Sequence, residues 1–149
     1  MPRQARNGWV RGFFNFPSVS NAAANPHFAG TGAVTIIDSL TPGFGLILEA
    51  FGFTAAITAG ASAGSQVFKL RKGGTSGTVV ATLTLALTNV DALGETTIAE
   101  VSTSATLEDL TLDDDDTFSI TRDGSGTDYT TEPEGFFFVR YRQRPQLDA

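Results

Sequence analysis

The chain has 149 residues and a formal net charge of −6, with 17% charged residues, 16 glycines, one histidine and no cysteine. The length suits a single domain, and the glycine-rich, weakly charged composition is typical of a β-rich protein with many turns. The absence of cysteine excludes a disulfide framework, a thiolate zinc site and a cysteine nucleophile, and a single histidine excludes a multi-histidine metal site within one chain.

Charge is unevenly distributed along the chain. Residues 1–30 contain three arginines and no acidic residue, residues 91–134 contain thirteen acidic residues and one arginine, and residues 135–149 contain three arginines and one aspartate. Basic ends around an acidic body favour self-complementary assembly or docking on an acidic partner, although the acidic body also suits a purely solubilising role. We find no secretory signal and no apolar stretch of ~20 residues, so we expect synthesis in a cytoplasm and no membrane partner.

Residues 1–30 differ from the rest of the chain. They hold five of its fifteen aromatic residues among arginine, asparagine, glycine and proline, and neither a helical nor a two-residue period persists there. We predict an extended N-terminal arm whose aromatic side chains dock in apolar grooves, either on this subunit or on another. Arginine with aromatics also suits nucleic acid, but three arginines on an acidic chain favour docking on protein and no nucleic-acid partner.

From residue 31 onward, short apolar segments alternate with turn residues, which predicts strands. The expected strands are Ala33–Leu40, Gly45–Ile57, Gln66–Lys72, Val79–Leu87, Thr96–Ser102, Thr117–Arg122 and Gly135–Arg142. Single helical turns are expected at Ala22–Asn25 and Asp91–Glu95. Seven or eight short strands predict an all-β fold: an antiparallel, jelly-roll-like β-sandwich over residues 31–144, preceded by the arm and followed by a tail at 145–149.

Two predicted strands carry apolar residues on both faces. In the second strand, strict alternation places Leu46, Leu48 and Ala50 on one face, and Phe51 and Phe53 on the other. In the last strand, one face holds aromatic and aliphatic residues and the opposite face holds Phe136, Phe138, Arg140 and Arg142. Only one face of each strand can line the core. We predict that a homo-oligomer, most simply a trimer or a dimer and preferably a trimer, covers the other, with the arm, a third layer or a long loop as alternatives.

Catalytic motifs are weak throughout. There is no P-loop, no dinucleotide-binding glycine pattern and no nucleophile elbow, and His27 lies in the arm, where nothing orients it as a base. A pair of carboxylates is the one remaining hydrolase chemistry, and we rank it last. Asp113–Asp116 suits a hard-cation site, but we favour a solvated β-turn because it lacks the spaced ligands of an EF-hand. We therefore expect a protein that is not an enzyme and needs no cofactor or metal.

Several segments of the sequence resemble the small β-sandwich virion proteins of tailed bacteriophages. These are the strand and glycine turn at Val67–Gly74, Leu110–Leu112 followed by the acidic turn, the segment Thr117–Gly124 with Gly126 and Thr127 after it, and the final strand from Phe136 to Arg142. The resemblance covers about residues 31–144. It includes capsid decoration (cement) proteins and the tips of tail fibres.

The resemblance implies a decoration protein on the outer capsid surface, which clamps the major capsid protein as a trimer. A receptor- or carbohydrate-binding module of a tail fibre is the alternative, and it would use Trp9, Tyr129 or Tyr141 beside a cleft. The protein-interface residues that we predict from the arm and the last strand are Arg6, Trp9, Arg11, Phe13, Phe14, Phe16, Phe28, Phe136, Phe138, Arg140 and Arg142.

Overall fold

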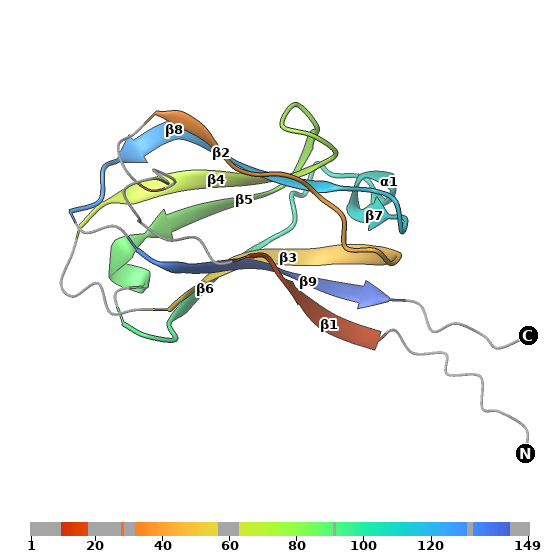
Figure 1. Ribbon diagram of the computed structural model, residues 1–149, viewed down its shortest axis with the longest axis horizontal. Helices are drawn as coiled ribbons and strands as arrows, with labels where there is room; N and C mark the ends of the chain where they lie inside the picture. The colour runs from red at the N-terminus through yellow and green to blue at the C-terminus, as the bar shows by residue number, and fades with distance from the viewer. Residues whose placement is uncertain are drawn as a thin grey trace, which may run out of the picture.

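A computed structural model describes residues 10–17, 28, 32–56, 63–90, 92–130 and 133–143. It contains two antiparallel sheets packed face to face (Figure 1). The elements are β1 (Val10–Asn15), β2 (Ala33–Leu40), β3 (Leu46–Ala55), β4 (Ser65–Lys72), β5 (Thr78–Ala86), the 3-10 turn η1 (Leu87–Asn89), β6 (Thr96–Glu100), α1 (Leu107–Leu110), β7 (Thr111–Leu112), β8 (Phe118–Thr127) and β9 (Gly135–Gln143). The predicted all-β antiparallel sandwich is confirmed.

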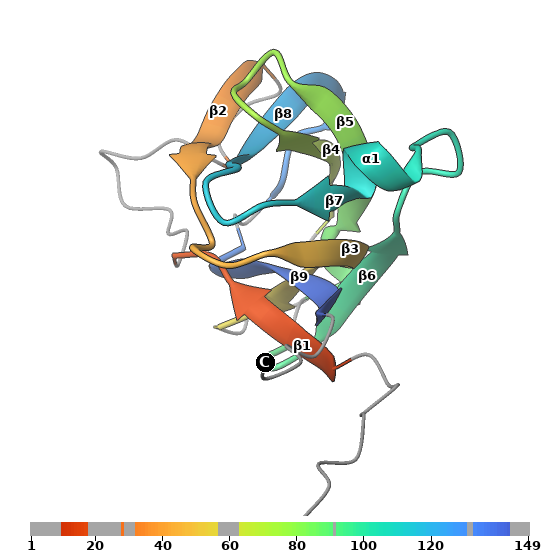
Figure 2. The same ribbon diagram turned by 90° about the vertical axis from the view of Figure 1, so that its right-hand side faces the viewer.

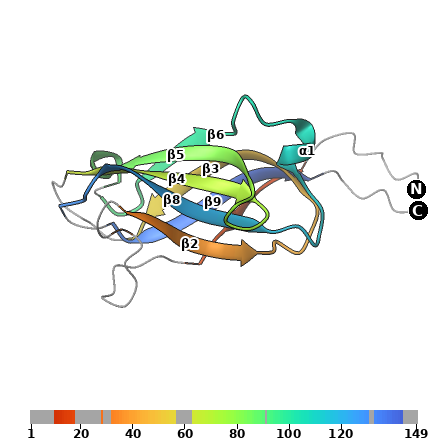
Figure 3. The ribbon, with the colours of Figure 1, turned by 90° about the horizontal axis from the view of Figure 1, so that it is seen from above.

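The two sheets are separate layers when viewed from the end (Figure 2). Sheet A has the strand order β1-β9-β3-β6, with β7 paired to the start of β3, and sheet B has the order β2-β8-β4-β5. Seen from above, the strands of sheet B lie across those of sheet A (Figure 3). Because β9 joins β1 to β3, the last strand of the described residues lies in the interior of sheet A.

The core between the sheets is built around aromatic rings. Phe137 of β9 lies 5.4 Å from Phe51, 5.0 Å from Phe53 and 5.1 Å from Phe68, measured between ring centroids, and all four side chains are inaccessible to solvent. Phe28 completes this cluster at 6.3 Å from Phe137. Each such ring contributes about 1.5–3 kcal/mol through burial, so the aromatic cluster contributes strongly to holding β3, β4 and β9 together.

A β-bulge in β3 reverses the side-chain orientation that was predicted for the second half of this strand. The register of β3 against β9 shifts between Leu48 and Ala50, so the side-chain alternation reverses there. Leu46 and Leu48 face the core, and after the bulge Phe51 and Phe53 face the core as well. The expectation that β3 exposes a second face rich in phenylalanine is therefore wrong, because one extra residue turns both rings inward.

The described part of the expected arm belongs to the sandwich. Residues 10–15 form β1, which pairs with β9 along its whole length, and the backbone N–H of Phe16 donates to the carbonyl of Phe137 at 2.9 Å. Phe14 lies against Phe16 and Phe118 on the inner side of the sheet. The predicted boundary at residue 30 is thus corrected: the sandwich includes at least Val10–Asn15, and these aromatics dock on their own subunit.

One short helix was not expected. In α1 the Thr106 hydroxyl accepts a bond from the backbone N–H of Asp109, and the Asp109 carboxylate accepts one from the N–H of Thr106 at 2.8 Å, which is a capping box. Of the two predicted helical turns, residues 22–25 lie outside the described residues, and residues 92–95 form a turn that is not helical. No helix in the described part of the chain has the length and hydropathy that a membrane span requires.

Candidate functional site

The outer face of sheet B is polar. A cross-strand row runs through Thr35 on β2, Thr121 on β8, Lys69 on β4 and Thr82 on β5, each directly opposite the next. Lys69 Nζ also lies 3.1 Å from the carboxylate of Asp123. Such a face needs no cover, because its side chains are those of a sheet exposed to water.

The outer face of sheet A is different, because apolar residues occupy its middle. The register places Asn15 opposite Phe138, Phe138 opposite Gly52, and Gly52 opposite Ile98, so these four residues form one row across β1, β9, β3 and β6. Phe13 lies in the next row along β1 and packs edge-to-face on Phe138 with ring centroids 5.7 Å apart. We call Phe13, Phe138 and Ile98 the Phe13 patch.

Exposure within the Phe13 patch is concentrated at two side chains. Phe13 is 65% exposed and Ile98 is 45% exposed, whereas Phe138 is only 5% exposed because Phe13 lies against it. An isolated apolar residue on a surface needs no explanation, but a phenylalanine held against a second ring on an open sheet is an ordered apolar projection. The patch therefore has the form of an anchor for another molecule.

Alternating charges border the patch. The Glu49 carboxylate lies 3.3 Å from Arg11 Nε and 3.4 Å from Arg140 Nε, and Arg140 Nη2 lies 3.4 Å from the carboxylate of Glu100. Arg11 and Glu100 are highly exposed, so the Arg11–Glu49 and Arg140–Glu100 pairs each contribute at most about 1 kcal/mol to stability. The pairs place two arginines and two glutamates beside an apolar centre, and this arrangement favours pairing with a complementary charge pattern.

The structure brings most, but not all, of the predicted interface residues together. Six of them share the outer face of sheet A, namely Arg11, Phe13, Phe136, Phe138, Arg140 and Arg142. Phe14 is partly buried on the inner side of the sheet. Phe16 and Phe28 are 3% and 0% exposed, so they are core residues rather than the interface residues predicted. Arg6 and Trp9 lie outside the described residues.

Three members of this face were not predicted: Ile98, Glu49 and Glu100. Ile98 sits in a strand of threonine, alanine and glutamate, and nothing in that strand marks it as a contact residue. It joins the patch only because β6 pairs with β3, which places it beside Gly52. Glu49 directly follows the core residue Leu48, so it points to the outer side, toward Arg11 and Arg140.

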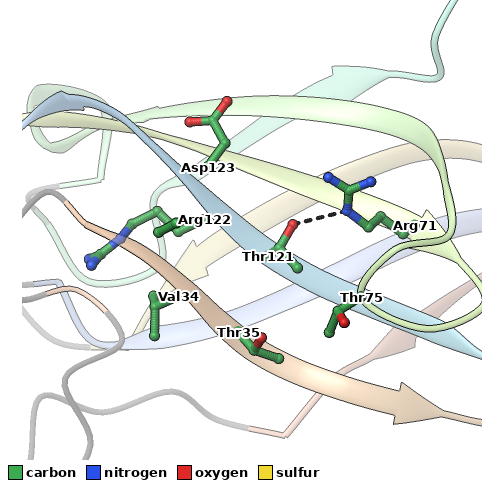
Figure 4. Close-up of a pocket in the computed structure, with 8 residues that line it drawn as sticks. Val34, Thr35, Arg71, Thr75, Thr121, Arg122 and Asp123 are labelled. Carbon is green, nitrogen blue, oxygen red and sulfur yellow. Dashed lines mark hydrogen bonds between the residues drawn. The ribbon is translucent and has the colours of Figure 1, made fainter.

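An open hollow of about 420 Å³ lies on sheet B, with Thr35, Arg71, Thr75 and Thr121 among its lining residues (Figure 4). Arg71 is held in place, because its Nε donates to Thr121 Oγ1 at 3.1 Å and its Nη1 donates to the carbonyl of Gly77 at 2.9 Å. The guanidinium of Arg71 thus stabilises the β4–β5 turn through these hydrogen bonds. The hollow is open, and its lining mixes these polar side chains with Ala33 and Val34.

Arg122 borders the same hollow but extends away from Arg71 (Figure 4). Its Nε donates to the carbonyl of Gly32 at 2.7 Å and its Nη1 donates to Oε1 of Gln66 at 2.9 Å. Gln66 Nε2 in turn donates to the carbonyl of Phe28 at 3.3 Å. Burial lowers the pKa of Arg122. This buried polar network ties residues 28 and 32 to strands β4 and β8.

The acidic cluster forms the predicted turn. The backbone N–H of Asp116 donates to the carbonyl of Asp113 at 3.2 Å, and the Asp116 carboxylate accepts from the N–H of Asp113 at 2.8 Å. Lys72 Nζ lies 3.7 Å from Asp116 and donates to the carbonyls of Glu108 and Thr111 at 3.0 and 2.7 Å. Within the described ranges, no three histidine, aspartate or glutamate side chains gather as ligands for a metal ion.

The tyrosines do not form a sugar-binding platform. Tyr129 is 6% exposed and its hydroxyl donates to the carbonyl of Leu85 at 2.7 Å, and its burial raises its pKa. Tyr141 is partly buried and lies 5.2 Å from Phe44 between ring centroids. Trp9, the third aromatic considered for carbohydrate binding, lies outside the described residues.

Comparison of the chain with protein-family models, with curated proteins and with solved structures finds no match.

Proposed function

We propose that the protein is a structural, non-enzymatic assembly protein that docks the outer face of sheet A against another protein. Its proposed role is that of a capsid decoration protein, which binds the major capsid protein on the outside of an assembled phage shell. The observation that supports docking is the Phe13 patch: an apolar projection with a charged border on one sheet, while the opposite sheet has a polar outer face.

The arrangement has the composition of a protein-binding surface. Interfaces between proteins combine a desolvated apolar or aromatic centre with a polar rim, and a few central side chains carry most of the binding energy. Burial of a phenylalanine as exposed as Phe13 contributes about 1.5–3 kcal/mol. The ion pairs of Glu49 and Glu100 with Arg11 and Arg140 then select partners of matching charge pattern.

The capsid assignment draws on the sequence resemblance to small β-sandwich virion proteins. A protein that binds only the assembled shell stabilises that state by mass action, to an extent set by its concentration relative to its dissociation constant. Such a role needs no catalytic group and no cofactor. It needs a rigid body and a docking face, and the two-sheet sandwich with its outward Phe13 supplies both.

The test is the number of copies per purified virus particle, measured by quantitative mass spectrometry against the major capsid protein. A decoration protein is expected in hundreds of copies, removable without opening the shell, and its removal is expected to lower the temperature at which the shell breaks. A copy number of only a few per particle would indicate a tail protein instead of a capsid protein. Absence from particles would overturn the virion assignment.

A further inference from the structure

Besides its outer face, sheet A has a second candidate surface for protein contacts, which is its edge strand β1. We propose that β1 pairs, antiparallel, with β1 of a second copy of this chain, which joins the two A sheets into one continuous sheet. Figure 2 shows β1 as the outermost strand of sheet A, and β9 is its neighbour on the inner side. No strand of the described residues pairs with the other side of β1.

The backbone of β1 presents a regular set of free groups on that side. In an antiparallel pair, the residues that bond to the neighbouring strand alternate with residues that point away from it. Phe16 donates to Phe137, so Phe14 and Gly12 are the earlier residues that face β9. The N–H and C=O groups of Arg11, Phe13 and Asn15 therefore point away from β9.

Among the four sheet edges of the described structure, that of β1 has the least protection against strand addition. Natural edges are blocked by bulges, by short length with charge, or by a covering segment. The β2 edge has two register shifts, the β5 edge is bridged between Ala81 and Val101, and β6 has five residues ending in the exposed Glu100. By contrast, β1 pairs in unbroken register over six residues.

The residues of β1 are complementary to a second β1 in one register. With Phe13 opposite Phe13 of the second copy, Arg11 lies opposite Asn15, and all three outward residues of both strands form about six backbone hydrogen bonds. No like charges face each other, and on the inner side Phe14 lies opposite Gly12, a large residue against the smallest. The ring of Phe13 lies beside its counterpart on the same outer face, so the two Phe13 patches become one larger surface.

This pairing is two-fold symmetric, so it produces a dimer rather than the trimer expected from the family resemblance. Sedimentation of the purified full chain over roughly a hundredfold range of concentration tests it, because a monomer–dimer equilibrium depends on concentration. We expect a concentration-dependent dimer. A monomer throughout that range, or a trimer, overturns the proposal.

Two variants of one residue separate the backbone contribution from the side chain. Asn15→Pro removes an outward N–H that β9 does not use, and an edge strand tolerates proline at such a position. It is expected to weaken self-association at least about tenfold, since two symmetry-related bonds are lost. Asn15→Ala keeps the N–H and is expected to change self-association less than about twofold. Equal effects of the two variants contradict strand pairing.

Cross-linking gives a readout that does not depend on the proline variant remaining folded. The chain has no cysteine, so Phe13→Cys introduces a single thiol. In the proposed register the two Cα atoms are about 5.5 Å apart, within reach of a disulfide. Phe13→Cys is expected to form a covalent dimer under mild oxidation, whereas Ile98→Cys, exposed on the opposite edge strand, is not. Equal cross-linking of both, or of neither, overturns the proposal. None of these three experiments involves a shell, so the dimer proposal and the capsid proposal fail independently of each other.

Discussion

The ring of Phe138 on β9 lies directly over Gly52 on β3. A β-carbon at residue 52 would lie 2.7 Å from Cε1 of Phe138 and 2.7 Å from the backbone oxygen of Thr97. The missing side chain at Gly52 is therefore what allows Phe138 to lie flat on the outer face of sheet A, where Phe13 covers it. The form of the Phe13 patch depends on this one glycine.

Gly52→Ala is expected to destabilise the fold by about 1–3 kcal/mol, because the new methyl group meets a backbone oxygen that cannot move aside cheaply. Urea unfolding followed by tryptophan or tyrosine fluorescence measures the change. Gly74→Ala is the matched control, since a β-carbon there meets no atom within 4 Å. Similar small effects of both variants would show that Phe138 can move away from β3 at little cost.

The buried guanidinium of Arg122 gives a second prediction. Arg122→Met keeps much of the side-chain volume but removes the donors to Gly32 and Gln66. Buried acceptors left without partners cost more than a hydrogen bond contributes, so we expect a loss of about 2–4 kcal/mol in the free energy of unfolding. Arg11→Met, at an exposed position, is expected to cost less than about 1 kcal/mol. An Arg122→Met protein as stable as wild type contradicts a structural role for this network.

The burial of Tyr129 leads to a prediction about how the free energy of unfolding changes at alkaline pH. Burial raises the pKa of Tyr129 above the ordinary value of about 10. The unfolded chain therefore releases this proton at a lower pH than the folded chain, so the free energy of unfolding falls as the pH rises above about 10. In Tyr129→Phe this contribution is absent, and the fall between about pH 9 and pH 11 is expected to be shallower.

Urea unfolding at several alkaline pH values measures that slope. Tyr129→Phe is also expected to cost about 1 kcal/mol at neutral pH, because it leaves the carbonyl of Leu85 without its hydroxyl donor. Parallel pH profiles for the two proteins would mean that the Tyr129 hydroxyl is not protected from solvent in the folded state.

Most strands were predictable because each carries an alternating pattern between clear turn residues. The strand predicted at Ala33–Leu40 has the same bounds in the structure, and the one predicted at Gly135–Arg142 ends one residue later. Strand β1 was missed because Phe13 and Phe14 are adjacent, one facing outward and the other inward, so no apolar alternation appears. When an edge strand has apolar residues on both faces, apolar and polar residues do not alternate, and its sequence resembles that of an irregular segment.

The β3 bulge and the composition of the outer face of sheet A depend on strand pairing, which a single sequence does not reveal. Alternation along Leu46–Ala55 is compatible with either face, and only the two-against-one pairing with β9 turns Phe51 inward. The outward set of β9 was predictable, since Phe138 and Arg140 alternate with core residues. Ile98 was not, because its place beside Gly52 follows from the neighbour that β6 has in the sheet.

A shell-binding comparison of two serine variants tests the docking role of the Phe13 patch most directly. Phe13 and Leu107 are almost equally exposed, at 65% and 63%, but Leu107 lies on α1 and outside the patch. Phe13→Ser is expected to reduce co-sedimentation with decoration-free shells at least about tenfold, since burial of a phenylalanine contributes about 1.5–3 kcal/mol. Leu107→Ser is expected to bind as wild type. If the folded Phe13→Ser protein binds as tightly as the Leu107→Ser protein, the outer face of sheet A is not the docking surface.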